Sequence, residues 1–105
     1  MVVRIQQSGV VALAVKISSN VAEKLAKKHG VTRDEIIECF ANRTACFLLD
    51  TRAEHKTDPD TRWFVAQTNR GRCLKVVFIP IDQNIHIRTA YEANSEEIRI
   101  YNKFT

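Results

Sequence analysis

The sequence predicts an α+β domain: two N-terminal helices and a C-terminal helix packed on a four-stranded antiparallel sheet, after a short N-terminal strand. Three observations support this prediction. Residues 20–42 show helical spacing and capping signals, residues 45–91 hold four β-type segments, and the last ten residues return to helical signals. Because helices and antiparallel strands are segregated along the chain, the layout is α+β rather than an alternating α/β arrangement.

Composition indicates one globular domain without extreme charge. The chain has 105 residues, of which 45% are hydrophobic and 27% charged, and this length suits a single domain, residues 1–105. With 16 Lys+Arg against 12 Asp+Glu, the net charge is +4. This mild excess fits a nucleic-acid or acidic partner, and it fits a merely solvated surface equally well.

The N-terminal region carries no targeting or membrane signal. Residues 1–9 are expected to be disordered or an artefact of an upstream start, and Val10–Ile17 is the expected first strand. The apolar run from Val10 to Val15 is too short for a secretory signal or a membrane span. We therefore expect a cytoplasmic protein with no membrane partner, and a monomer when free.

Cysteine and histidine spacing argues against a cofactor. The three cysteines, Cys39, Cys46 and Cys73, contain no CxxC pair, which favours buried free thiols in a reducing cytosol. The three histidines show no ligand spacing to one another. No metal site and no cofactor are expected.

Two helices are expected before residue 43. Asn20, with Glu23 three residues later, is the predicted N-cap of the first helix, which Gly30 ends. Thr32 caps the second, which finishes near Asn42. Such a pair resembles a DNA-reading unit, but the acidic side chains of the second helix would repel phosphates. We therefore favour a packing unit.

After Arg43 the spacing of the hydrophobic residues changes from the helical period of about 3.6 residues to the period of about two or less that is typical of strands. Pro80 should end one of these strands, because proline cannot donate to a ladder, and Gly71 should provide a hairpin turn. Asn94 or Ser95 caps a final helix that ends near Lys103. The predicted segments are strands at Ala45–Asp50, Arg62–Thr68, Cys73–Ile79 and Ile85–Tyr91, with a polar loop at Thr51–Thr61.

The stretch "IHIRTAYEA", Ile85 to Ala93, mixes strand residues with chemically active side chains. Strand parity predicts that His86 and Arg88 share a face with Trp63, in a shallow groove, and that Lys75 and Tyr91 lie on the opposite face. One interpretation is an RNA or phosphate site. The other is an exposed sheet face with an arginine over a tryptophan.

The loop after residue 50 also has two interpretations. Its polar side chains either close over a ligand or pin the loop through bonds to its own backbone. The residues concerned are Asp50, Arg52, His55 and Asp58.

Several motifs resemble the BrnT family, which consists of small bacterial type II toxins with a RelE-like ribonuclease fold. The resemblance covers roughly residues 16–104 and keeps the family's order and spacing. It rests on "KHGVTRDEIIECFANR" (28–43), "RW" (62–63), "GRCLKVVF" (71–78) and "TAYEANSEEIRIY" (89–101).

The chain departs from the family where its basic strand ends. The toxins have a Ser-Ala-Arg motif at this point, and this chain has Thr89-Ala90-Tyr91, with His86 at a usually basic position. "IRTAYE" also resembles a subgroup of short bacterial proteins often labelled ADP-ribosyl-(dinitrogen reductase) hydrolase. Those hydrolases are larger helical proteins with acidic metal-binding clusters. We do not expect that activity here.

The resemblance implies an mRNA-cleaving ribonuclease in which the RNA 2′-OH attacks its own phosphate, and a cognate antitoxin protein as partner. The alternative is a non-catalytic protein- or nucleic-acid-binding module. The candidate catalytic residues are Arg88, His86, Glu92 and Tyr91, and the candidate substrate-binding residues are Trp63, Arg72 and Lys75. Arg88 and Arg72, helped by Lys75, would steady the phosphate, and His86 or Glu92 would transfer protons.

Overall fold

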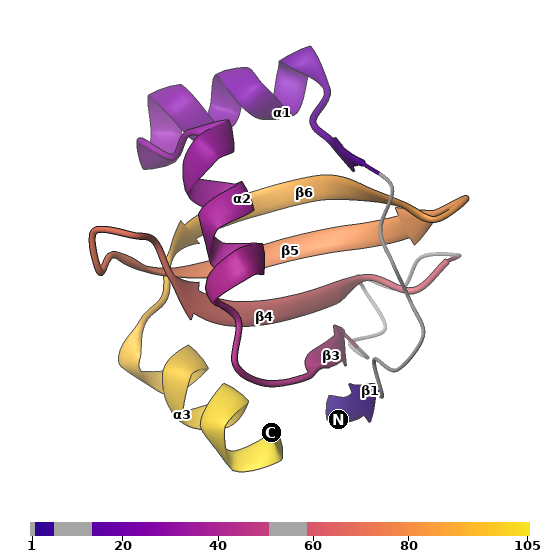
Figure 1. Ribbon diagram of the computed structural model, residues 1–105, viewed down its shortest axis with the longest axis vertical. Helices are drawn as coiled ribbons and strands as arrows, with labels where there is room; N and C mark the ends of the chain where they lie inside the picture. The colour runs from indigo at the N-terminus through magenta and orange to yellow at the C-terminus, as the bar shows by residue number, and fades with distance from the viewer. Residues whose placement is uncertain (1, 6–13, 51–58) are drawn as a thin grey trace.

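The computed structural model describes residues 2–5, 14–50 and 59–105, with side chains from residue 14 onward. Figure 1 shows a sheet with α1 beside its β6 edge and α2 crossing in front of the strands. The elements are β1 (Val2–Ile5), β2 (Val15–Lys16), α1 (Ser19–Lys24), η1 (Leu25–His29), α2 (Arg33–Asn42), β3 (Phe47–Asp50), β4 (Arg62–Gln67), β5 (Cys73–Ile81), β6 (Asn84–Glu92) and α3 (Ser95–Phe104).

The α+β class and the three helices are confirmed, but the four-stranded antiparallel sheet is wrong. The sheet is mixed and has six strands in the order β1-β3-β4-β5-β6-β2. Val2–Ile5, where we expected disorder, pairs antiparallel with β3, and β2 pairs parallel with β6. The strand that contains β2 was predicted within Val10–Ile17, but its parallel partner was not, because alternation along one strand does not reveal which strand lies beside it.

The helix signals were read correctly with one exception. Thr32 forms the expected capping box with Glu35. Of the two candidate caps of the last helix, Asn94 rather than Ser95 is the N-cap, and it forms a capping box with Glu97 that was not predicted. The first helix, however, is capped by Ser18, whose hydroxyl accepts the N–H of Val21, rather than by Asn20. Ser18 lies two positions earlier and accepts one of the backbone N–H groups that the first turn of a helix leaves without a partner.

Both hairpins depend on residues with positive φ. The β4–β5 loop closes at the Thr68–Arg72 pair, with Gly71 at φ 84°. The β5–β6 turn places Asp82 at φ 51° and Gln83 at φ 68°, as a type I′ turn requires. Pro80 does not end β5, which continues to Ile81. On the side of β5 away from β6, the neighbouring strand β4 pairs with β5 only as far as Phe78, whose partner is Arg62. Pro80 therefore lies on an open edge of β5, where a residue without a backbone N–H is tolerated.

The predicted register of β4 against β5 was wrong by one residue, so the side chains of β4 were assigned to the wrong faces of the sheet. Phe64 pairs with Val76, and Trp63 pairs with Val77. The reason is the hairpin loop, whose three residues between Thr68 and Arg72 set a different parity from a two- or four-residue loop. Trp63 therefore shares a face with Lys75 and Tyr91.

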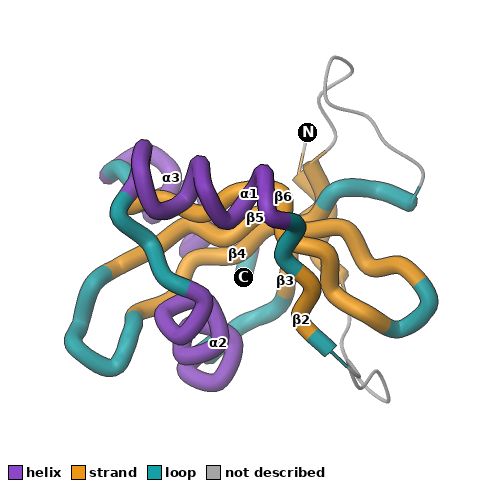
Figure 2. The backbone as a smooth tube through the Cα atoms, turned by 90° about the horizontal axis from the view of Figure 1, so that it is seen from above, coloured by secondary structure: helices purple, strands orange, loops and turns teal. Residues whose placement is uncertain are grey.

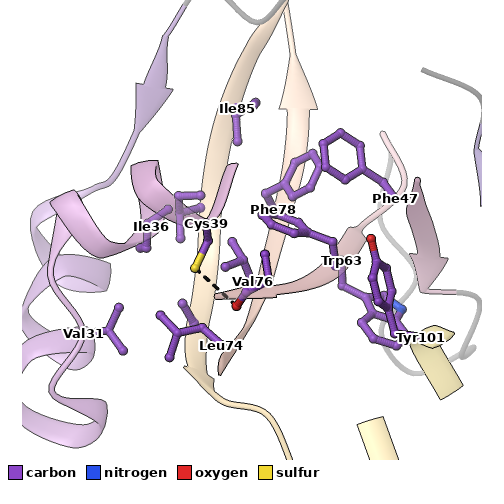
Figure 3. Close-up of a cluster of buried hydrophobic side chains, with 14 of the residues drawn as sticks. Val31, Ile36, Cys39, Phe47, Trp63, Leu74, Val76, Phe78, Ile85 and Tyr101 are labelled. Carbon is purple, nitrogen blue, oxygen red and sulfur yellow. Dashed lines mark hydrogen bonds between the residues drawn. The ribbon is translucent and has the colours of Figure 1, made fainter. Parts of the chain in front are cut away.

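One face, which we call the α2 face, carries the main core. Phe40 of α2 packs against Phe64 and Phe78, with ring centroids 4.7 and 5.5 Å apart, and Phe47 completes the aromatic cluster. Cys39 Sγ donates to the carbonyl of Ala66 at 3.6 Å, the dashed contact of Figure 3. Seen from above, α2 lies on one side of the strands (Figure 2).

The other face, which we call the α3 face, is covered in part by α3. Tyr101 packs on Trp63, with ring centroids 5.9 Å apart, and these two rings lie together at one end of the cluster in Figure 3. Tyr101 also donates its hydroxyl to the carbonyl of Cys46 at 2.7 Å. This contact ties the C-terminal helix to the segment that leads into β3.

Two predictions fall partly or wholly outside the described residues. Only Val15–Lys16 of the expected strand Val10–Ile17 is a described strand, and residues 10–13 are not described. The interpretations of the loop side chains Arg52, His55 and Asp58 likewise lie outside. None of the helices that the structure describes is long and apolar enough to cross a membrane.

Candidate functional site

The α3 face brings together three of the predicted site residues. Lys75 of β5 and Tyr91 of β6 are direct cross-strand partners. Lys75 Nζ lies 4.6 Å from the ring centroid of Trp63 on β4 and 5.9 Å from that of Tyr91. The ammonium group is therefore held between two aromatic faces, an arrangement that favours a cation.

A fourth residue, Glu97 of α3, completes this group and was not among the predicted residues. Its Oε2 accepts the hydroxyl of Tyr91 at 2.6 Å and the ammonium of Lys75 at 3.0 Å. The side chains of Lys75 and Glu97 are only 12% and 15% exposed. We call Trp63, Lys75, Tyr91 and Glu97 the α3-face cluster.

The capping box at the start of α3 explains why Glu97 can reach the sheet. Its Oε1 accepts the backbone N–H of Asn94 at 3.0 Å, and its own N–H donates to Asn94 Oδ1 at 2.8 Å. One oxygen thus caps the helix, and the other is left for Tyr91 and Lys75. The same local signal that begins the helix therefore also aims a carboxylate at the sheet.

Glu97 remains ionised in this setting. Burial raises its pKa, but the hydrogen bonds from Tyr91, from the Asn94 N–H and from Lys75 together outweigh burial and lower the pKa below 4.5. Near neutral pH the cluster therefore contains a carboxylate and an ammonium in contact, with a phenol donating to the carboxylate. It can present a hydroxyl and a cation to a ligand.

His29 reaches the cluster from the helical side. Its ring centroid is 5.6 Å from that of Tyr91. His29 is the last residue of η1, a π-helical segment that ends at Gly30 with φ 61°, whose N–H donates to the Leu25 carbonyl. Short π-helical segments are frequent at functional sites. Here the segment places an imidazole beside the phenol.

Arg72 holds the helical backbone at this place and is largely occupied. Its Nη2 donates to the His29 carbonyl at 2.8 Å and its Nη1 to the Gly30 carbonyl at 2.7 Å. Its Nε donates to Glu92 at 3.0 Å, and Nη1 also pairs with Glu35 at 3.3 Å. The guanidinium joins the end of η1, the start of α2 and the end of β6. Arg72 and Glu92, both predicted site residues, thus bond to each other.

His86 and Arg88 lie apart from the cluster. His86 pairs with Ile79 of β5 and with Lys16 of β2, on the α3 face. It is five residues from Tyr91, which is about 16 Å along a strand. The exposed Arg88 sits at the irregularity where Val77 pairs with Thr89 and Phe78 with Ile87. The register therefore leaves Arg88 with no directly opposite residue.

A groove of about 660 Å³ is lined by residues of α3 and β4 and by the loop after β4. Side-chain amides and hydroxyls dominate its lining, with Asn42 donating to Asn69 Oδ1 and to the Gln67 carbonyl. Among the described residues, no group of three or more His, Cys, Asp or Glu side chains is placed to hold a metal ion.

Comparison with known protein families gives one match, to a model described as "Ribonuclease toxin, BrnT, of type II toxin-antitoxin system". It covers residues 18–97, about three quarters of the chain. The chain belongs to the BrnT family. No curated protein and no solved structure matches it. The match spans the whole α3-face cluster and His29, so these residues lie in the part of the chain that the BrnT family shares.

The sequence alone carries the resemblance to the BrnT family, but it does not link Glu97 or His29 to the site. Both carried a signal. Glu97 was visible as the N3 residue of a capping box, and His29 stands in the "KHG" motif. What sequence could not supply was the contact of each with Tyr91, which depends on where two helices meet the sheet.

Proposed function

We propose that this chain is an mRNA-cleaving toxin whose substrate phosphate binds at Lys75 and Tyr91. The observation that carries the proposal is the cross-strand pairing of a cation with a phenol on the α3 face. The resemblance to the BrnT toxins implies an arginine at the position that Tyr91 occupies in this chain. The ammonium of Lys75 lies on the neighbouring strand and supplies a positive charge beside that position.

In the proposed reaction the RNA 2′-oxygen attacks the adjacent phosphorus and displaces the 5′-oxygen. Negative charge accumulates on the phosphoryl oxygens in the transition state, where a positioned cation stabilises it most. An ammonium has three donors, and Glu97 uses one of those of Lys75. The others can face a phosphoryl oxygen and protonate the leaving oxygen. Tyr91 adds a hydroxyl to the same oxygens.

The other predicted residues take supporting places in this proposal. His86 and Arg88 lie farther along β6 and contact phosphates or bases of the RNA that flank the cleaved bond. Arg72 and Glu92 hold the helical backbone against the end of β6 and so shape the site. The ring of Trp63 packs against the ammonium of Lys75. This contact holds the positive charge at the surface of the sheet.

Expression in a bacterial host tests this function. The wild type should arrest growth, and mRNA from arrested cells should carry new cleavage ends. Tyr91→Phe removes one hydroxyl, Lys75→Met removes the charge with little change in volume, and both should relieve the arrest at matched protein levels. Lys103→Met, an exposed lysine on α3, is the control and should stay toxic. A wild type that is harmless at high level would rule the proposal out.

A second function, a non-catalytic binding module, is favoured by one observation. Lys75 is already paired with Glu97, and both side chains are mostly buried, so the cluster is satisfied without a ligand. Such a module would bind RNA or a protein without cleaving it. An NMR titration with short single-stranded RNA at two salt concentrations separates the cases. Salt-sensitive shifts at Trp63 and Tyr91 with intact RNA support the module.

The family also suggests the setting in which either function operates. Type II systems pair a toxin with a protein antitoxin, and we propose that such a partner neutralises this chain in the cytoplasm, where mRNA is translated. Co-expression with the product of a neighbouring small reading frame should restore growth. Copurification of the two proteins would support the pairing.

A further inference from the structure

The α3-face cluster supplies a cation and a hydroxyl but no group free to take a proton. Glu97 is ionised, yet both of its oxygens are engaged, by the Asn94 N–H on one side and by Tyr91 and Lys75 on the other. Tyr91 donates its hydroxyl to that carboxylate. Activation of a 2′-OH needs a base within hydrogen-bond reach of the attacking oxygen.

His29 is the described histidine that contacts this cluster. Its ring centroid lies 5.6 Å from that of Tyr91, with the two ring planes tilted by 38°, and the residue is half-buried rather than enclosed. Trp63, Lys75 and Tyr91 lie on the successive strands β4, β5 and β6, and η1, which carries His29, packs against β6. The imidazole therefore stands at the other side of the phenol from the ammonium.

The backbone of His29 is fixed more firmly than a helix end usually is. Arg72 donates to the carbonyls of both His29 and Gly30, and these bonds satisfy acceptors that a helix end otherwise leaves open. The same guanidinium bonds Glu92, the residue after Tyr91. One side chain thus ties the backbone that carries the imidazole to the residue that follows Tyr91.

We propose that His29 is the general base of the site. The inference rests on the proposed RNA-cleaving function and adds a catalytic residue to it. Imidazole exchanges protons near neutral pH, and it is the side chain most often used for this task. The substrate phosphate would lie over Tyr91, with the attacking sugar toward His29 and the leaving oxygen toward Lys75.

The step balances with these groups. The proton of the 2′-OH moves to the imidazole as the O2′–P bond forms, and the P–O5′ bond breaks. The leaving oxygen takes a proton from the Lys75 ammonium. The products are a 2′,3′-cyclic phosphate and a 5′-hydroxyl end, with an imidazolium and a neutral amine that exchange protons with water before the next turnover.

The experiment measures cleavage of an mRNA transcript by the purified chain and its variants, with mapping of cyclic-phosphate ends. His29→Ala and His29→Gln should both slow cleavage by about 10²–10⁴-fold, while their unfolding temperatures stay near that of the wild type. Free imidazole added to His29→Ala should restore part of the rate. His86→Ala controls for the specificity of the rescue: a loss that follows from its contacts with flanking RNA should not be reversed by imidazole. Lys103→Ala, an exposed change on α3, should cleave like the wild type with or without imidazole.

The possible outcomes distinguish failure of the general-base role of His29 from failure of the proposed RNA-cleaving function. Wild-type cleavage that survives both His29 substitutions overturns the inference alone, as does a loss that imidazole does not reverse in the folded Ala variant. A wild type that yields no cyclic-phosphate ends overturns the proposed function, and the inference with it. A large loss in both variants, reversed by imidazole only in His29→Ala, establishes the base.

Discussion

Replacement of Glu97 should reveal how strongly the α3-face cluster holds the C-terminal helix. Glu97→Ala removes the acceptor for Tyr91, for Lys75 and for the Asn94 N–H at once. It leaves a mostly buried ammonium without its partner. Breaking a fully buried pair costs about 3–5 kcal/mol, and residual exposure reduces this. We expect a loss of about 3 kcal/mol in the free energy of unfolding.

Glu97→Gln separates the charge from the cap. The amide oxygen can still accept the Asn94 N–H, because glutamine also serves at this position of a capping box. The loss should therefore be smaller, about 1–2 kcal/mol. Glu96→Gln is the matched control, since Glu96 lies one residue earlier, is exposed and pairs only locally with Arg99. Its unfolding curve should hardly move.

The pH dependence supplies an independent check. The pKa of Glu97 is lowered in the folded chain from its ordinary value of 4.5, so the unfolded chain binds its proton more readily. The stabilisation is therefore complete above about pH 4.5 and is lost as the pH falls through the folded value. The difference between wild type and Glu97→Gln should be largest near pH 7 and shrink below pH 4.5.

The assay is urea unfolding followed by fluorescence of Trp63, which packs in the cluster, and by circular dichroism. A loss below about 1 kcal/mol for Glu97→Ala would mean that solvent screens the cluster as it does an ordinary surface pair. A difference between wild type and Glu97→Gln that does not change with pH would show that the carboxylate's charge is not what stabilises α3. Either result would refute the reasoning.

Three further predictions concern other parts of the chain. Arg72→Ala should lower the free energy of unfolding by about 2–4 kcal/mol, because several acceptors lose their donor, whereas exposed Arg70→Ala should stay within about 0.5 kcal/mol; equal effects in urea unfolding would contradict this. Iodoacetamide should label Cys46 before Cys39, because Cys39 is buried and burial raises the pKa of its thiol to about 12. Peptide mass spectrometry measures the order of labelling, and labelling of Cys39 first would contradict the prediction. Gly71→Ala should cost about 1 kcal/mol through its positive φ alone, since a Cβ there meets nothing within 4 Å; a neutral substitution would show that the loop relaxes.

The sequence predicted most of the fold because its signals are local. The capping box at Thr32 predicts one helix start to the residue, Asn94 or Ser95 predicts another to within one residue, and Gly30 predicts a helix end. The strands Arg62–Gln67 and Cys73–Ile81 were found within two residues at each end. Such signals depend on neighbours in the chain, whose contacts exist before any tertiary packing.

The candidate site was predicted only in pieces. Trp63, Lys75 and Tyr91 were all named, yet parity placed Trp63 on the opposite face from the other two. The error came from one hairpin loop, where a single residue of register moves every side chain of a strand to the other face. Alternation alone does not reveal whether a loop has two, three or four residues.

The sequence by itself determined most of the secondary structure, the family and most of the chemical groups at the site. Only the tertiary structure decided which of these groups meet. Glu97 and His29 come from two helices, six and 62 positions from Tyr91 along the chain, and each reaches it across the sheet. Contacts of this kind depend on strand register and helix docking, which are set by burial of the whole core. No short stretch of sequence specifies them.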